Sequence, residues 1–134
     1  MKNRPLRYLF LLLALAWAGV IYFLSSQPGT DTPMLFPFQD KLLHIIAYAI
    51  LGFLGMGALE AASHGYHAWQ VWLITVLVTV YGILDEFHQH FVPGRTVDGF
   101  DVMADVVGGL LGIWVMYSLV KSVARKTPGT ETRS

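Results

Sequence analysis

The stretch VMADVVGGLLGIWVMYSLV, Val102–Val120, indicates the fold class of this protein. A helix that crosses a bilayer needs about 20 mostly apolar residues, so this stretch predicts a transmembrane helix over residues 100–120. One acidic residue, Asp105, lies inside it. An unpaired carboxylate at that depth costs at least about 2.5 kcal/mol, so Asp105 should face other helices and find a hydrogen-bond donor.

Three further apolar stretches precede this one. They are LRYLFLLLALAWAGVIYFL over 6–24, LLHIIAYAILGFLGMGAL over 42–59, and residues 68–87, which begin AWQVWLITVLVTVYGIL. The first has a longer apolar run than a signal peptide, and no A-x-A cleavage pattern follows that run, so we expect it to stay uncleaved. The chain is predicted to be an all-α polytopic membrane protein with four transmembrane helices, a single domain over residues 1–126 and a disordered tail over 127–134.

The composition agrees with a membrane protein. Hydrophobic residues make up 54% of the 134 residues and charged residues only 13%, against about 25% charged in soluble domains. The formal net charge is zero, which gives no reason to expect a nucleic-acid partner. The absence of cysteine excludes disulfides, zinc–thiolate sites and cysteine nucleophiles.

Basic residues predict the orientation, because cytoplasmic loops are enriched in Lys and Arg. Those near the two chain ends are Lys2, Arg4, Arg7, Lys121, Arg125, Lys126 and Arg133. Four spans place both ends on one side, so both termini should be cytoplasmic. The connections that contain Lys41 and Arg95 should then face outward.

Helical spacing predicts two faces that meet. Residues three or four apart lie on one side of a helix. The second span carries such a face in Lys41, His44, Tyr48, Gly52 and Gly55, and the fourth span carries another in Asp101, Asp105, Gly108 and Gly112. Glycine allows close helix approach in lipid, so these faces should pack together with their polar ends near the outer surface. Donors available to Asp105 are Arg95, Lys41, His44 and Tyr48.

Simpler roles remain open for several polar residues. Asp98 could be the N-cap of the fourth helix, with Asp101 near its third position. Lys41 could snorkel to the interface, and Arg95 could clamp Asp85 or Asp105. His88 fits interfacial packing better than ligand binding. Glu86 lies about 100° around the helix from Asp85, so the two need not face the same partner.

Two segments, DKLLHIIAYAILG from Asp40 and DEFHQHFVPGRTVDGFDVMADVVGGLLG from Asp85, together with SSQP after the first span, resemble the VanZ-like family. The resemblance implies a small polytopic membrane protein of the cell envelope. The founding member of the family is associated with reduced susceptibility to the glycopeptide teicoplanin. The positions that match the family pattern are Asp40, Lys41, His44, Tyr48, Asp85, Glu86, Gln89, Phe91, Pro93, Arg95, Asp98, Asp101 and Asp105.

The leading hypothesis is an outward-facing polar pocket in a bacterial inner or plasma membrane protein. It would engage an envelope lipid, a lipid-linked glycan or precursor, or a lipophilic glycopeptide, with other membrane lipids as further partners. Its cations would contact phosphate or carboxylate, and its carboxylates would accept amine or sugar hydrogen bonds. The predicted ligand-binding residues are Asp40, Lys41, His44, Tyr48, Asp85, Glu86, Gln89, Arg95, Asp98, Asp101 and Asp105.

Two alternatives belong to other classes. A membrane-embedded hydrolase or transferase would use His44 with Asp85, Glu86 or Asp105 as acid and base. A metal form would use carboxylate ligands, although no metal motif is present, and the sequence predicts no particular cofactor. An accessory protein would use the charges only as a salt-bridge network that fixes helix register.

Overall fold

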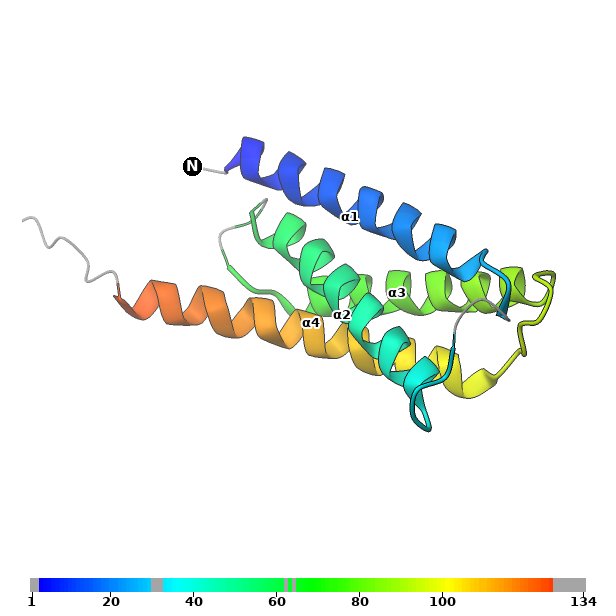
Figure 1. Cartoon of the computed structure of the whole chain (residues 1–134). Coiled ribbons are helices and arrows are strands. Elements are labelled where there is room, and N and C mark those ends of the chain that lie inside the picture. Colours follow the sequence, from blue (N-terminus) through cyan, green and yellow to red (C-terminus); the bar gives the residue numbers. More distant parts are fainter. Residues whose placement is uncertain (1–2, 30–32, 62, 64, 127–134) are drawn as a thin grey trace, which may run out of the picture.

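The computed structural model describes residues 3–29, 33–61, 63 and 65–126. These residues form four helices and no strand: α1 (Arg4–Ser25), α2 (Gln39–Glu60), α3 (Ala68–Gln89) and α4 (Gly99–Lys126) (Figure 1). All four are long and apolar enough to cross a membrane, so the prediction of an all-α, four-span protein is confirmed. The predicted tail over 127–134 lies outside the described residues.

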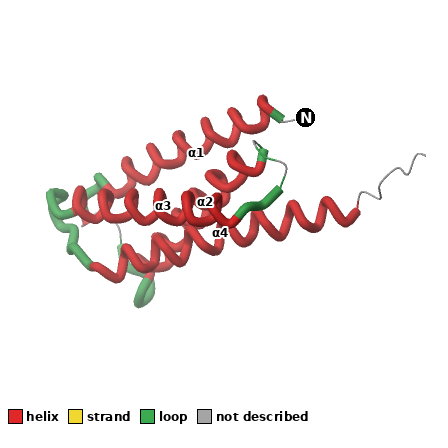
Figure 2. The backbone as a smooth tube through the Cα atoms, turned by 180° about the vertical axis from the view of Figure 1, so that it is seen from behind, coloured by secondary structure: helices red, strands yellow, loops and turns green. Residues whose placement is uncertain are grey.

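Successive helices run in opposite directions (Figures 1 and 2). The start of α1, the α2–α3 connection and the end of α4 therefore share one end of the molecule, which we call the termini end. The α1–α2 and α3–α4 connections share the other, which we call the distal end. This is the up-and-down arrangement that four spans require, and the cytoplasmic location of the termini end stays a prediction.

The helices α2 and α4 form the most extensive pairing, and glycines on both helices permit it. A methyl group added at Gly52, Gly108 or Gly112 would lie less than 3 Å from a main-chain oxygen of the opposite helix. The two backbones thus touch along a seam with no room for side chains. The two faces predicted from spacing do pack together, apart from Gly55, which faces Ile74 of α3.

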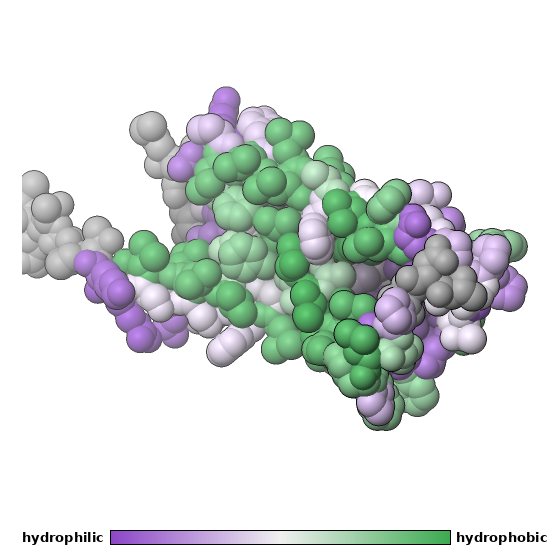
Figure 3. All heavy atoms as spheres, viewed as in Figure 1, coloured by the Kyte–Doolittle hydropathy of each residue, from purple (hydrophilic) through white to green (hydrophobic). Residues whose placement is uncertain are grey.

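The interior is small, as expected for a chain whose middle is surrounded by lipid. Tyr48, Met56, Val78 and Met116 are among its buried residues. Figure 3 shows apolar side chains over the middle of the molecule and hydrophilic ones toward its two ends. The helix α1 is mostly exposed, and the Trp17 indole fixes it to α2 by donating to the Ala47 carbonyl at 2.8 Å.

The distal connections are held by a tight turn. Gly94 has a φ of 74°, and the Arg95 amide donates to the Val92 carbonyl at 3.2 Å. This is the Pro-Gly arrangement of a type II turn, in which glycine accepts the positive φ. The Gly29 amide donates to the Pro93 carbonyl at 3.1 Å, so the α1–α2 connection rests on this turn.

Candidate functional site

Polar side chains of α2, α3 and α4 and of the α3–α4 connection gather at the distal end. We call them the distal cluster: Asp40, Lys41, His44, Tyr48, Asp85, Glu86, Gln89, Asp98, Asp101 and Asp105. The Lys41 ammonium is its main cation. Its Nζ lies 2.9 Å from Asp40, 2.7 Å from Asp98 and 2.5 Å from Asp101. Lys41 is therefore engaged by protein carboxylates rather than free at the interface.

The carboxylate of Asp105 finds its donor in His44. Asp105 is only 1% exposed, and its Oδ1 lies 2.7 Å from His44 Nδ1. A carboxylate can only accept, so this contact requires the imidazole proton on Nδ1. The other ring nitrogen, Nε2, lies 3.9 Å from Asp101 Oδ2. Of the four donors considered from the sequence, His44 is the one that pairs with Asp105.

A second pair of contacts surrounds Asp85. The Tyr48 hydroxyl donates to Asp85 Oδ2 at 3.3 Å, and the Gln89 amide donates to the same oxygen at 3.4 Å. Tyr48 and Gln89 are 1% and 3% exposed. The Tyr48–Asp85 contact joins α2 to α3 beside the His44–Asp105 pair, because the Tyr48 ring stacks on the His44 ring at a centroid distance of 6.3 Å. The Gln89–Asp85 contact lies within α3.

Glu86 differs from its neighbours because only one of its two carboxylate oxygens has a hydrogen-bond partner among the described residues. Its Oε1 accepts the main-chain N–H of Asp98. Its Oε2 is buried without a hydrogen-bond partner among the described residues, and the residue is only 7% exposed. The charge of Glu86 interacts with those of Asp101, His44 and Asp105. Asp85 thus faces Tyr48 of α2 while Glu86 faces the start of α4, as their 100° separation predicts.

Asp98 combines a structural and an electrostatic role. Its Oδ1 accepts the Phe100 amide at 3.0 Å, so Asp98 is the N-cap of α4 as one sequence interpretation predicted. Its Oδ2 contacts Lys41. The Lys41 ammonium and the Phe100 amide hold the pKa of Asp98 below its ordinary value, and Asp98 remains charged at neutral pH.

Two basic residues of the distal end lie away from the cluster. Arg95 donates to main-chain carbonyls at the end of α1, from Nε to Gln27 at 3.1 Å and from Nη2 to Leu24 at 3.0 Å. Those bonds do not involve Asp85 or Asp105. His88 contacts Ser26 Oγ at 2.9 Å and stacks on a ring of α1. Both residues fasten α1 to the α3–α4 hairpin.

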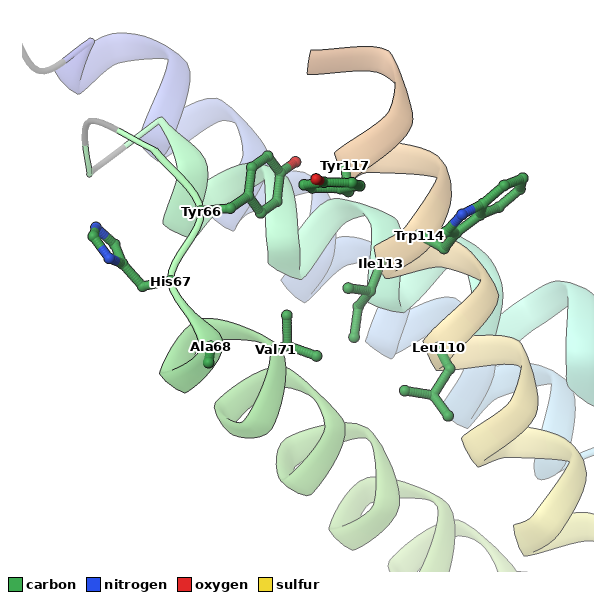
Figure 4. Close-up of a pocket in the computed structure, with 8 residues that line it drawn as sticks. All are labelled: Tyr66, His67, Ala68, Val71, Leu110, Ile113, Trp114 and Tyr117. Carbon is green, nitrogen blue, oxygen red and sulfur yellow. The ribbon is translucent and has the colours of Figure 1, made fainter. Parts of the chain in front are cut away.

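The described residues contain no group of three or more His, Cys, Asp or Glu side chains arranged to hold a metal ion. The geometry thus gives the metal form of the hydrolase hypothesis no support. A cavity of about 330 Å³ lies at the termini end, between α3 and α4 (Figure 4). The sequence gives no sign of this cavity, because its walls are ordinary apolar and interfacial residues.

The chemistry of the distal cluster follows from its charge balance. Six carboxylates face one lysine and one histidine, and both bases are already engaged by them. The cluster therefore has spare acceptors and few spare donors. It suits a ligand that donates hydrogen bonds or carries positive charge, and His44–Asp105 adds a base that could move a proton.

In comparisons of the chain with curated proteins and with solved structures, no match was found. A family model described as VanZ/LLP1 matches residues 10–121. The match covers most of the chain, including every residue of the distal cluster and all the glycines of the α2–α4 seam. The chain therefore belongs to the VanZ/LLP1 family.

Proposed function

We propose that this membrane protein binds, at its distal end, the head group of a cell-envelope lipid, a lipid-linked glycan or a lipophilic glycopeptide. The group recognised is one that donates hydrogen bonds, above all a primary ammonium. The observation that carries the proposal is the buried Oε2 of Glu86, which has no hydrogen-bond partner among the residues that the structure describes. A buried acceptor without a donor costs about 1–3 kcal/mol, so proteins usually supply it with a partner.

The charge balance favours a donor over a phosphate as the recognised group. Lys41 is surrounded by three carboxylates and Arg95 is bonded to main-chain carbonyls. Neither cation is available to hold an anion without losing those contacts. Of the two contacts expected from the sequence, cations with phosphate or carboxylate and carboxylates with amine or sugar groups, these bonds favour the second.

The location also suits a head group. The cluster lies at the ends of helices that can span a membrane, which is the depth of the polar part of a lipid. Its outer members are open, with side chains 45% exposed at Asp40 and 38% exposed at Asp98, whereas Asp101 beneath them is 7% exposed. Exposed apolar residues such as Phe38 and Phe100 lie beside it in the chain and suit contact with acyl chains.

The test compares phosphatidylethanolamine with phosphatidylcholine by native mass spectrometry of the full chain in detergent. The two lipids have the same net charge, but only the ethanolamine ammonium can donate hydrogen bonds. Wild type should retain phosphatidylethanolamine preferentially. Glu86→Gln should reduce that preference about tenfold, the value of a hydrogen bond to a charged group. Teicoplanin as a third ligand tests the lipophilic glycopeptide.

The matched control is Glu60→Gln, because Glu60 Oε2 is also buried without a partner among the described residues but lies at the termini end of α2. This variant should retain the wild-type preference. Equal retention of the two lipids by wild type, or an equal loss in both variants, would contradict the proposal.

One observation favours a second function, an enzyme acting on an envelope lipid. The His44–Asp105 contact orients an imidazole whose Nε2 accepts no hydrogen bond from the described residues, which is the geometry of a general base. Incubation with envelope lipids should then give a product that His44→Ala abolishes. His88→Ala removes a histidine outside the cluster and should leave turnover intact; absence of product with wild type would eliminate the enzyme.

A further inference from the structure

The cavity at the termini end lies outside the proposed head-group site. Its walls include Tyr66, Ala68, Val71, Leu110, Trp114 and Tyr117, from the α2–α3 connection, the first turns of α3 and the middle of α4 (Figure 4). Its volume of about 330 Å³ falls within the range of small-molecule sites. These walls are mainly aliphatic and aromatic, so the interior suits a hydrocarbon chain.

Two tyrosines of the cavity wall, Tyr66 and Tyr117, carry hydroxyl groups that can donate hydrogen bonds. The Tyr66 hydroxyl is buried without a hydrogen-bond partner in the parts of the chain that the structure describes. Burial, with Glu60 and Tyr117 nearby, raises the pKa of Tyr66, so its hydroxyl keeps its proton and can donate. The Lys121 ammonium lies 5.4 Å from the centre of the Tyr117 ring and contacts its hydroxyl at 3.4 Å.

The surroundings carry further positive charge. Arg125 and Lys126 continue α4 beyond Lys121. The termini end is therefore rich in cations, whereas the distal cluster has spare hydrogen-bond acceptors. An apolar cavity with hydroxyl groups in its wall and α4 cations beyond Tyr117 complements a ligand with a hydrocarbon tail and an anionic, acceptor-rich head.

We propose that this cavity binds an anionic phospholipid of the leaflet on the termini side, with an acyl chain between α3 and α4 and the phosphate region at Tyr66 and Lys121. The acyl chain fills the cavity between the first turns of α3 and the middle of α4. It also supplies acceptors for the Tyr66 hydroxyl and for Lys121. The site is independent of the distal cluster, so either one can fail without the other.

The test uses the full chain in detergent, stripped of lipid and then exposed to dioleoyl phosphatidylglycerol or dioleoyl phosphatidylcholine. Native mass spectrometry measures the fraction of protein that retains each lipid. Wild type should retain phosphatidylglycerol preferentially. Lys121→Gln should reduce that retention about fivefold, as expected for one basic residue at an anionic surface, and Ala68→Trp should reduce retention of both lipids by filling the cavity.

Arg7→Gln is the control, since it removes one positive charge from the same end but from a helix that does not line the cavity. It should retain phosphatidylglycerol like wild type. Melting curves of each variant identify any that fail to fold, and Tyr66→Phe, which removes only the hydroxyl, then provides the second test with a smaller loss of retention. Equal retention of the two lipids by wild type, full retention by Ala68→Trp, or equal losses in Lys121→Gln and Arg7→Gln would each overturn the proposal.

Discussion

Lys41 is the residue that holds the distal cluster together, because one ammonium neutralises carboxylates from α2, from the α3–α4 connection and from α4. Lys41→Met should lower the free energy of unfolding by about 2 kcal/mol, between the values for exposed and for buried ion pairs. Thermal melting in detergent measures the change. Lys121→Met, at an exposed position of α4, should change little; equal losses in the two variants would contradict this account.

Glu86 should show opposite effects on stability and on binding. Glu86→Gln keeps an oxygen for the Asp98 amide and replaces the unpartnered oxygen with a donor among carboxylates. The variant should therefore unfold at a higher temperature, by up to about 1 kcal/mol in free energy, while its affinity for phosphatidylethanolamine falls. A lower melting temperature would mean that Glu86 Oε2 already has a stabilising partner in the free protein.

Asp98 makes the stability of the folded protein depend on pH in the acidic range. Lys41 and the Phe100 amide lower its folded-state pKa below the ordinary value of about 3.9. The charged Asp98 carboxylate therefore stabilises the folded state fully at pH values above about 3.9, the ordinary pKa. This stabilisation is lost as the pH falls toward the lower folded-state pKa. The melting temperature of wild type should fall as the pH is lowered from 7 to 3. The melting temperature of Asp98→Asn should fall less steeply over the same range. An identical acid slope in the variant would contradict the assignment.

Some contacts of single residues in the site could be predicted from the sequence, and others could not. Asp105 inside an apolar span had to find a donor, and helical spacing placed His44 within reach. Arg95 could not be placed in this way, because its partners are main-chain carbonyls at the end of α1, which every sequence possesses. The unsatisfied oxygen of Glu86 depends on side-chain positions that spacing alone does not determine.

At the scale of single elements, the α2–α4 seam is the main packing feature. Gly112→Ala would place a methyl group against the Ala49 carbonyl of α2, and crowding of this kind costs about 3 kcal/mol. Its melting temperature should fall sharply. Gly19→Ala on α1 meets nothing within 4 Å and should be neutral or slightly stabilising. A tolerated Gly112→Ala would mean that α2 and α4 are farther apart than the structure places them.

The helices themselves were predictable because the membrane requires long apolar runs, but their ends were less so. The helix α4 continues to Lys126, beyond the transmembrane span that the sequence predicts over residues 100–120. Lys121, Arg125 and Lys126 are good helix formers and basic residues suit a helix C-terminus. Hydropathy marks where lipid ends rather than where the helix ends, so the apolar run does not extend to these last turns.

At the scale of the whole molecule, the arrangement separates two kinds of chemistry. The distal end concentrates carboxylates and the termini end concentrates cations. The positive-inside rule predicts that the carboxylates face outward, where an envelope lipid or a glycopeptide would reach them, and that the proposed phospholipid cavity faces the cytoplasmic leaflet. The two proposed sites thus lie at opposite leaflets. The distal site recognises an ammonium or another hydrogen-bond donor, and the cavity recognises an anionic phosphate.

The chain contains no cysteine, so its orientation can be measured with single introduced thiols. Thr96→Cys lies in the exposed distal connection and Lys126→Cys at the exposed end of α4. A membrane-impermeant maleimide applied to intact cells should label Thr96→Cys, and it should label Lys126→Cys only after lysis. The reverse pattern would place the distal cluster in the cytoplasm.

The central claim is that Glu86 Oε2 receives a hydrogen bond from a ligand head group. A crystal structure grown from a lipidic mesophase that contains phosphatidylethanolamine tests it most directly. The account predicts head-group density with a nitrogen about 3 Å from Glu86 Oε2, while Lys41 stays bonded to its carboxylates. A Glu86 carboxylate bonded on both oxygens by protein groups, with no head-group density at the distal cluster, would contradict it.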